Sequence, residues 1–496
     1  MERVIKLLLI IASLMTVELS LTESKVNDLK KKSKVMSYHQ PLYGNICEVE
    51  DRRPKVHCYC DSRAPRSAAW ADCWVFSPGL SEDDPLWSSF SSQPLIQHLI
   101  FNVRSDDALT FVPAKALVRL DTLKHLTIQF ATLKTIPPFA FTNSSSLKQM
   151  NLKSNRITNL EMNSFSRLMM LSNLSLEDNQ ISELKRGVFF ELPNLHLLYL
   201  TNNNLSLIHE GCFKHLNNLV ELKLDSNYIS VVTREMFEGL ENLARLDLKN
   251  NKLTMIGNLA FSELWGLKEL ALDNNAIEYI SERSFGGLTQ LKKLTLSGNK
   301  LTAFYEDIIE DIRSLLILDL SDNLLETMSY ETVRSVVESD QLPSTAIYLD
   351  GNPFTCDCRL SWVYALRNKT SGALRQALDR ITCVLDPTLG NQINQQSDPD
   401  PQTEHKIFDS YEYYEDKDDR EVLYDEPKKV ITESNAEKLM NIPLEALPCP
   451  KELQSLEESN HPVQNEIRLK AFSKGPAWRL DCTVSVVMLA LLLVYS

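Results

Sequence analysis

Residues 219–240 read LVELKLDSNYISVVTREMFEGL, and this arrangement of apolar and polar residues returns at a fixed step of 24 residues. Within it, the run E-L-K-L-D alternates charged and apolar side chains. Such alternation predicts a β-strand with one apolar face and one polar face. A constant period of this length predicts a solenoid, in which each turn of chain stacks on the next.

Two further columns keep the same step. An asparagine follows each strand at Asn155, Asn179, Asn203, Asn227, Asn251, Asn275, Asn299 and Asn323. A phenylalanine fills the outer side of each coil at Phe141, Phe165, Phe189, Phe213, Phe237, Phe261 and Phe285. Because an unpaired buried backbone group costs about 1–3 kcal/mol, we expect each asparagine amide to bond the backbone of a neighbouring coil.

The repeat extends beyond its strict region. One coil upstream has Ala131 in the asparagine position, and a looser coil is expected near residues 95–101. Downstream, Asn352 follows Asn323 after 29 residues. We therefore predict about ten or eleven coils over residues 95–353 in an α/β solenoid with a parallel, concave β-sheet. No coil is stable alone, and stacking makes the apolar core continuous.

The first residues have the composition of a secretory signal. Two basic residues precede an apolar run that is too short to span a membrane. We expect a signal peptide over residues 1–22, followed by a polar segment over residues 23–46. The chain then enters an oxidising compartment, where its cysteines are expected to pair.

Eight of the ten cysteines form two clusters at the ends of the repeats. The first is Cys47, Cys58, Cys60 and Cys73, and the second is Cys356, Cys358, Cys383 and Cys449. The end of a solenoid exposes a slice of core that needs a cap. We expect disulfide-bonded caps over residues 47–94 and 354–450. Zinc binding is the alternative, which a secreted chain disfavours.

The phrase L-x-x-L-x-L-x-x-N is the leucine-rich repeat pattern. The sequence NPFTCDCRLSW at residues 352–362 closely resembles the C-terminal cap of extracellular leucine-rich repeat proteins. The C-x-C motif with one distant cysteine on each side resembles their N-terminal cap. The resemblance covers residues 47–449 and implies that the cysteines of each cap pair first with third and second with fourth. The implied disulfides are Cys47–Cys60, Cys58–Cys73, Cys356–Cys383 and Cys358–Cys449.

A narrower resemblance is to a family of insect cell-surface adhesion proteins. It is carried by the motif C-Y-C-D at residues 58–61, the motif D-C-W at residues 72–74, about ten repeats and a lipid-anchor signal. It implies homophilic cell–cell adhesion in neuromuscular or neuronal recognition. The acidic stretch inside the second cap departs from what we can assign to this family.

Two cysteines lie outside the clusters, Cys212 and Cys482. Cys482 belongs to a C-terminal tail that we expect to be removed, so Cys212 is the remaining cysteine of the mature chain. It precedes Phe213 in a position that other coils fill with small or apolar residues. We expect a half-buried free thiol, with an intermolecular disulfide as the alternative. His209 and His215 flank it in outward positions, which disfavours a metal site.

The last residues have the pattern of a glycosylphosphatidylinositol signal. The apolar run over residues 483–494 is too short to cross a bilayer, which needs about 20 residues. We expect attachment at Ser473, with Ser459 or Gly475 as poorer sites, a stalk over residues 451–473 and a removed tail over residues 474–496. A short transmembrane anchor and a secreted form are the alternatives.

Four N-x-S/T sequons stand at Asn143, Asn173, Asn204 and Asn368. Asn173 occupies a polar strand position, so a glycan on it would block part of the concave face. The other three are expected in loops or at edges. An unused sequon is the alternative for Asn173.

An acidic insert interrupts the second cap at about residues 390–440. Its centre, residues 409–426, has nine acidic and two basic residues, and we expect it to be disordered. Tyrosines among acids in a secreted chain favour sulfation, which would attract a basic partner. The candidates are Tyr411, Tyr413, Tyr414 and Tyr424. A plain solvated spacer is the alternative.

The polar strand positions are the candidate binding surface. They are Glu221, Lys223, Asp225, Arg245, Asp247, Lys249, Glu269, Asp273 and Lys293. Their charges are mixed, whereas a nucleic-acid binder needs a basic stripe. The mixture suits a protein partner, including a second copy in a two-fold contact. A solvated strand face is the alternative.

No phosphate-binding, hydrolase or metalloprotease motif is present in the sequence. We expect no catalytic residues, no cofactor, no metal and no small-molecule substrate. Two functions remain: a lipid-anchored cell-surface adhesion protein, or a ligand-capturing co-receptor or innate immune ectodomain without an intracellular signalling part. Aggregation of cells that express only this chain separates the two.

Overall fold

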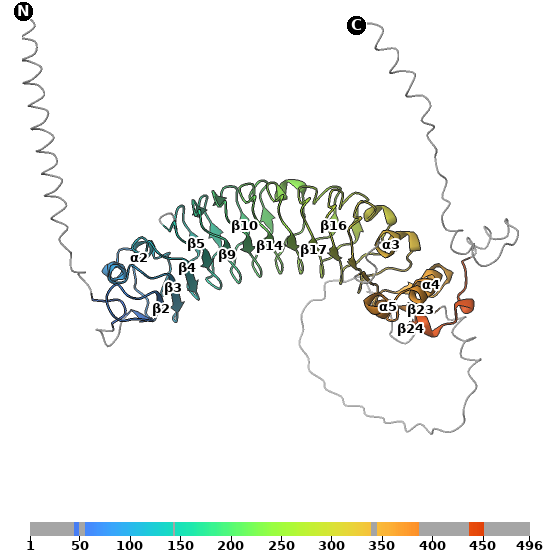
Figure 1. Cartoon of the computed structure of the whole chain (residues 1–496), viewed down its shortest axis with the longest axis horizontal. Coiled ribbons are helices and arrows are strands. Elements are labelled where there is room, and N and C mark those ends of the chain that lie inside the picture. Colours follow the sequence, from blue (N-terminus) through green and yellow to red (C-terminus); the bar gives the residue numbers. More distant parts are fainter. Residues whose placement is uncertain (1–43, 49–54, 142–143, 339–344, 386–435, 451–496) are drawn as a thin grey trace, which may run out of the picture. The chain divides into compact units, whose positions relative to one another are not determined.

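The computed structural model describes residues 44–48, 55–141, 144–338, 345–385 and 436–450 (Figure 1). The chain divides into two compact units. The first comprises residues 1–131 with 143–147, and the second comprises residues 132–142 with 148–496.

The first unit contains the strands β1, β2, β3 and β4, which are neighbours in that order. Strand β1 (Val56–Cys60) is antiparallel to β2 (Trp70–Val75), and the parallel strands β3 (His98–Val103) and β4 (His125–Gln129) follow. The 3-10 helix η1 (Pro85–Ser92) and the short helix α2 (Ala114–Leu117) lie between strands in the sequence. Aromatic side chains of η1 fill the core of this unit together with Phe101.

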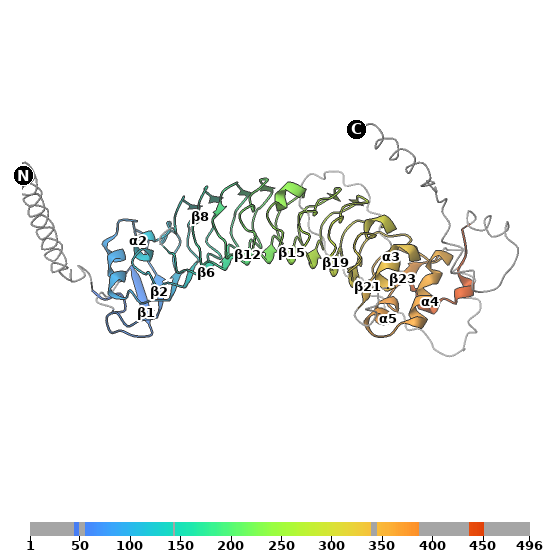
Figure 2. The same cartoon turned by 45° about the horizontal axis from the view of Figure 1, so that its top comes forward.

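The second unit contains nine parallel strands, which lie side by side in Figure 2. They are β6 (Gln149–Asn151), β9 (Asn173–Ser175), β12 (Leu197–Tyr199), β14 (Glu221–Lys223), β15 (Arg245–Asp247), β17 (Glu269–Ala271), β19 (Lys293–Thr295), β20 (Ile317–Asp319) and β21 (Ala346–Tyr348). Residues 24 apart face each other, as in Leu198 opposite Leu222. The predicted leucine-rich repeat solenoid with a parallel sheet is confirmed.

The asparagine column bonds successive coils as its spacing predicts. Asn179 donates from Nδ2 to the carbonyls of Leu152 and Leu176, both at 2.9 Å. Its Oδ1 accepts from the backbone N–H groups of Asn155 and Ile157, both at 3.0 Å. The same pattern recurs through the column to Asn352, which bonds the shifted coil to its neighbour.

The outer side of the second unit is held by stacked phenylalanine rings. Centroids lie 5.7–6.3 Å apart from Phe141 to Phe213, and 5.7–6.0 Å apart from Phe237 to Phe285. Phe213 and Phe237, both in the described part of the chain, do not stack on each other. Short parallel pairs of strands line the same side: β5 (Thr135–Ile136) with β7 (Asn159–Leu160), β8 (Phe165–Ser166) with β11 (Phe189–Phe190), β10 (Glu183–Leu184) with β13 (Leu207–Ile208), and β16 (Met255–Ile256) with β18 (Tyr279–Ile280).

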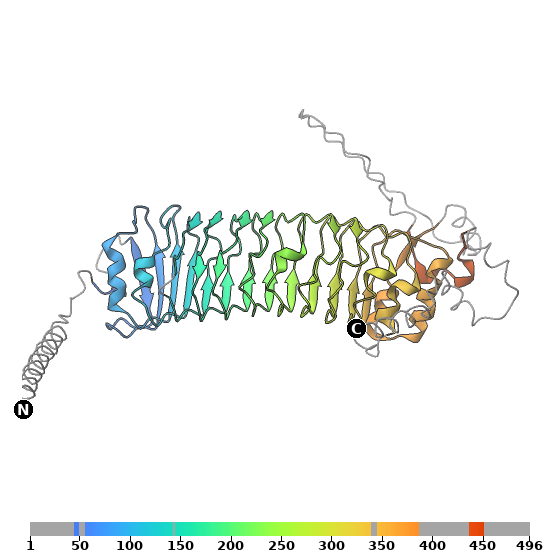
Figure 3. The same cartoon turned by 90° about the horizontal axis from the view of Figure 1, so that it is seen from above.

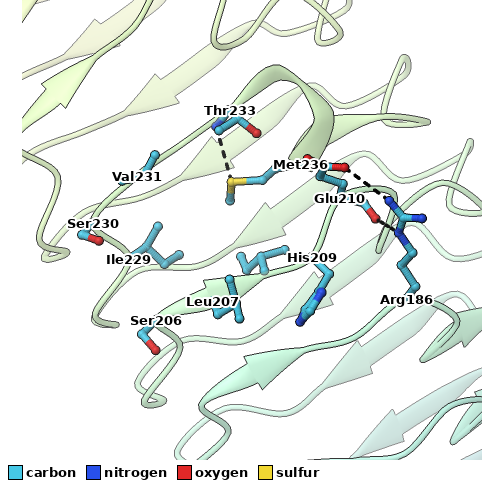
Figure 4. A pocket seen from close by; sticks show the side chains of 11 residues that line it. Arg186, Ser206, Leu207, His209, Glu210, Ile229, Ser230, Val231, Thr233 and Met236 are labelled. Atoms are coloured by element: carbon cyan, nitrogen blue, oxygen red, sulfur yellow. Dashed lines mark hydrogen bonds and ion pairs between the residues drawn. The ribbon is translucent and has the colours of Figure 1, made fainter.

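The outer layer is interrupted between β13 and β16. The chain there forms the 3-10 helix η2 (Arg234–Phe237), the helical turn near the middle of this unit in Figure 3. The backbone N–H of Thr233 donates to Sδ of Met236 at 3.4 Å. A hollow of about 500 Å³ opens beside this turn and is lined by Leu207, Ile229, Val231 and Met236 among others (Figure 4).

The end of the second unit is capped by helices and a small sheet. The helical elements are η3 (Glu306–Ile308), α3 (Tyr330–Val337), η5 (Cys358–Leu360), α4 (Ser361–Lys369), α5 (Gly372–Leu378), η7 (Leu439–Asn441) and η8 (Leu444–Ala446). Strand β23 (Thr382–Val384) pairs with β22 (Phe354–Thr355) and, antiparallel, with β24 (Ala436–Lys438). The acidic insert, expected to continue to about residue 440, therefore gives way to the folded cap by Ala436, because β24 completes the cap sheet.

Several expectations lie outside the described residues. They are the signal peptide, most of the segment over residues 23–46, Asn143, the acidic tyrosine segment, the stalk, Ser473 and the tail. Within the described ranges, no helix is both long enough and apolar enough to span a membrane.

Candidate functional site

The candidate surface is the polar face of β14, β15, β17 and β19. The central leucine of each strand is buried, so the residues on either side of it point to the opposite face. Seven of the nine candidates surround a shallow depression of about 150 Å³: Glu221, Lys223, Arg245, Asp247, Lys249, Glu269 and Lys293. Of the other two, Asp273 forms an ion pair with Lys249, and Asp225 accepts a hydrogen bond from Thr201.

One column across this face alternates in sign. Glu221, Arg245, Glu269 and Lys293 face one another in register on adjacent strands. Arg245 donates from Nε to Glu221 at 2.8 Å, with a second bond from its terminal nitrogen. Within the described chain, Glu269 and Lys293 make no ion pair. This end of the column is therefore open to a partner.

A second set of charges is tied more deeply into the sheet. Lys249 forms an ion pair with Asp273 at 3.1 Å. Asp273 is buried and also accepts from Oγ1 of Thr295 at 2.6 Å and from the backbone of Ser297 at 3.0 Å. Burial lowers the pKa of Lys249, but Asp273, together with the charges of Asp247 and Asp225, outweighs burial and leaves that pKa raised. Asp273 is thus a structural anchor for Lys249.

Asp247 is partly buried in this face and makes no ion pair with a described residue. Its carboxylate accepts from the backbone N–H of Lys249 at 3.1 Å. Burial raises the pKa of Asp247, and the charges of Asp225 and Asp273 add to this effect. A partner that brings a cation to Asp247 would relieve that cost.

Two contributors on β12 and its following turn were missed in the sequence. The Tyr199 ring lies 4.8 Å from Nζ of Lys223, and burial followed by Glu221 raises the pKa of the Tyr199 phenol. Thr201 donates to Asp225 at 2.7 Å. Tyr199 and Thr201 lie 24 residues before Lys223 and Asp225, so the period of the repeat could have identified them.

The described sequons differ in their surroundings. Asn173 is half-buried on β9, in the same column as Glu221 and two strands away, which is about 10 Å. Asn204 is exposed in a turn. Asn368 is exposed but lies in the last turn of α4, not in a loop or at an edge as expected, because the cap helix continues to Lys369.

The caps contain four disulfides, and they join the pairs that the resemblance implies. Cys47–Cys60 and Cys58–Cys73 lie in the first cap. Cys356–Cys383 and Cys358–Cys449 lie in the second, the latter across 91 residues of sequence. Cys383, before the acidic insert, and Cys449, after it, are therefore both bonded into the same cap.

Cys212 is free, and it is buried rather than half-buried as expected. It is buried in the position before Phe213. Val188, one coil before, and Ala260, two coils after, are buried in the equivalent position. Burial raises the pKa of its thiol to about 12, so the thiol is protonated at neutral pH. His209 contacts Glu183 at 2.5 Å, and His215 packs edge-on against Phe190.

Comparison with known proteins agrees with this architecture. A family model described as leucine rich repeat matches residues 121–181, 170–229, 217–270, 241–301 and 265–325. Connectin of Drosophila melanogaster is 36% identical over 107 residues, which are 21% of this chain and 15% of connectin. The connectin match is consistent with the narrower resemblance drawn from the first cap and the anchor signal.

Partial matches among solved structures include chains of two assemblies. A chain in the octameric complex of Latrophilin 3, Unc5D and FLRT2 matches 66% of this chain and 91% of its own, with TM-score 0.46 and 22% identity. A chain in the mouse RP105/MD-1 complex matches 63% of this chain and 53% of its own, with TM-score 0.48 and 20% identity.

Proposed function

We propose that this chain, whose repeats belong to the leucine-rich repeat family, is a cell-surface adhesion or recognition protein that binds another protein through the polar face of β14–β19. The observation that carries the proposal is the set of mixed charges on the open side of a rigid parallel sheet, with Glu269 and Lys293 left without an ion pair in the described chain. Repeats of this type are typically binding scaffolds rather than enzymes. The local similarity to connectin supports an adhesion role.

The finer proposal is that the partner is a second copy of this chain, in trans. The column Glu221, Arg245, Glu269, Lys293 reads −, +, −, + along the sheet. A two-fold axis reverses the order in the second copy. Glu221 then faces Lys293 of the other copy, and Arg245 faces Glu269. An isologous contact requires such a self-complementary patch, and charge complementarity favours the correct register.

The proposal extends to the membrane and the setting. We propose a glycosylphosphatidylinositol anchor at Ser473 on the outer face of the plasma membrane, supported by the small residues and short apolar run of the sequence. Phosphatidylinositol-specific phospholipase should release the protein from intact cells. Retention after complete digestion would contradict the anchor. The neuronal or neuromuscular setting rests on the resemblance.

The decisive experiment is aggregation of non-adhesive cells that express only this chain. Homophilic adhesion predicts that expressing cells cluster together and exclude cells that carry an empty vector. If expressing cells stay single while the protein is present on their surface, the homophilic proposal is wrong. Binding of a soluble ligand by the same cells would then favour the alternative, a ligand-capturing co-receptor or innate immune ectodomain.

A further inference from the structure

The first unit exposes an aromatic cluster on one face of its sheet. The motifs C-Y-C-D and D-C-W alternate cysteines with other residues along β1 and β2. Because side chains alternate between the faces of a strand, Cys58 and Cys73 point into the core. Tyr59, Asp72 and Trp74 therefore point to the opposite, open face.

Further aromatic residues extend this face along the same two strands. His57 lies 4.4 Å from Tyr59, Tyr59 lies 6.2 Å from Trp74, and Trp74 lies 6.1 Å from Phe76, all between ring centroids. Trp70 occupies the same face at the start of β2. The exposed fractions are 54% for Tyr59, 38% for Trp70 and 41% for Phe76, although these are side chains that folding normally buries.

Arg104, which directly follows β3, completes what we name the aromatic face, formed by His57, Tyr59, Trp70, Trp74, Phe76 and Arg104. Its guanidinium carbon lies 3.9 Å from the centroid of the Trp74 ring. Within the described residues, Arg104 has no carboxylate partner, and Asp72 on the same face accepts a 2.6 Å bond from Asn102. The Nε1–H of Trp74 is buried and lacks an acceptor.

These features favour one kind of occupant. Tyrosine, tryptophan and arginine are the residues that carry most of the binding energy in protein interfaces. A guanidinium that is stacked on a ring keeps its edge donors free and is pre-organised to bind a carboxylate. Because Asp72 bonds Asn102 and not Arg104, the Arg104 guanidinium is the cation that the described residues of this face leave without a carboxylate partner. It lies beside a large apolar area, so its complement is a surface that offers a carboxylate next to apolar side chains.

We propose that the aromatic face of the first unit docks a partner protein that presents apolar side chains next to a carboxylate. The apolar side chains pack on Tyr59, Trp70 and Phe76. The carboxylate binds Arg104. This surface shares no residue with the charged column on β14–β19 and adds a second contact to the proposed function.

The test is a selection of peptides from a random library displayed on phage, with the purified full-length protein as target. Selected peptides should contain an aromatic or aliphatic residue close to Asp or Glu. Their affinity should fall at least about tenfold on Arg104→Glu, which corresponds to about 1.4 kcal/mol. Phe76→Ser should weaken the same peptides. Arg119→Glu, the same charge change at an exposed residue of the first unit, should leave them unaffected.

A second selection against Arg104→Glu should return peptides with Lys or Arg in place of the acid, an exchange that a purely structural arginine would not produce. Retained disulfides and an unchanged melting temperature would show that the variant is folded. The proposal is overturned if no peptides are recovered, or if the peptides lack acids or bind Arg104→Glu as well as Arg119→Glu. Binding to an oligosaccharide array that Phe76→Ser abolishes would assign the face to a carbohydrate and also overturn it.

Discussion

Reversing the charge of Glu269 should abolish homophilic adhesion, and a second reversal should restore it. Glu269→Lys changes the column from −, +, −, + to −, +, +, +. In the proposed two-fold contact, Arg245 and residue 269 meet twice, so two attractive pairs become repulsive. Adding Arg245→Glu gives −, −, +, +, which is again self-complementary under the same axis.

The size of the effect follows from the exposure of the pair. Arg245 and Glu269 are both exposed, and pairs of this kind contribute about 0.2–1 kcal/mol each. Turning two attractions into two repulsions of similar size costs about 1–4 kcal/mol in total. This corresponds to a fall of about fivefold to a thousandfold in the association constant. Multivalent display on cells makes such a loss visible as loss of clustering.

The assay mixes two dye-labelled cell populations. Cells with Glu269→Lys should stay single, whereas cells with both substitutions should cluster. The double variant should also sort away from wild-type cells. Its new carboxylate at position 245 faces the wild-type Glu269, and its new ammonium at position 269 faces the wild-type Arg245, so both pairs repel. Glu282→Lys, at an exposed residue outside the column, is the control for surface charge.

Three results would refute this reasoning. One is normal clustering of Glu269→Lys cells with the protein at wild-type levels on the surface. Another is failure of the double variant to recover, since loss of the Glu221–Arg245 ion pair costs only about 0–1 kcal/mol. Mixed clusters of the double variant with wild type would also place the contact elsewhere.

Three further predictions concern the repeats themselves. Asn251→Ala leaves the carbonyls of Leu224 and Leu248 and the N–H of Ile229 without their side-chain partner. The free energy of unfolding, measured in urea, should therefore fall by about 3–6 kcal/mol. Lys252→Ala, at an exposed neighbour, is the control and should change it little. Cys212 should resist iodoacetamide in the native protein at neutral pH and react after unfolding in denaturant, as mass spectrometry would show; rapid native labelling would contradict its burial. Because the folded pKa of Asp247 is raised, ionisation costs stability as pH rises through that pKa, so Asp247→Asn should raise the melting temperature at pH 7 and lose this advantage below about pH 4; an equal effect at both pH values would contradict the role of charge.

The register of the sheet could be predicted because it depends only on local spacing. A step of 24 residues places Leu198 beside Leu222, and the asparagine column repeats the same bonds coil after coil. The nine charged candidates follow from the same spacing. The sequence therefore predicts which residues form the surface. Which of them pair with each other, such as Lys249 with Asp273, depends on side-chain conformations that spacing does not determine.

Other features depend on contacts between distant parts of the chain. β24 pairs with β23 across about fifty residues of acidic sequence, and no local pattern at Ala436 indicates a strand. Cys212 was expected to be half-buried in the position before Phe213, yet its side chain is fully buried in the core. The interruption at η2 is equally hidden, since Val231 and Val232 have the β-branched character that favours a strand.

That interruption has a mechanical consequence. The stability of a solenoid is approximately the sum of the terms for each repeat and for each junction between neighbours. The junction between the coils of Phe213 and Phe237 lacks both the ring stack and the outer strand pair, and the hollow beside η2 lies there. Under tension along the repeats, we expect this junction to part first and divide the extension into two steps of unequal length. The hollow would then mark the place where the solenoid first separates under load.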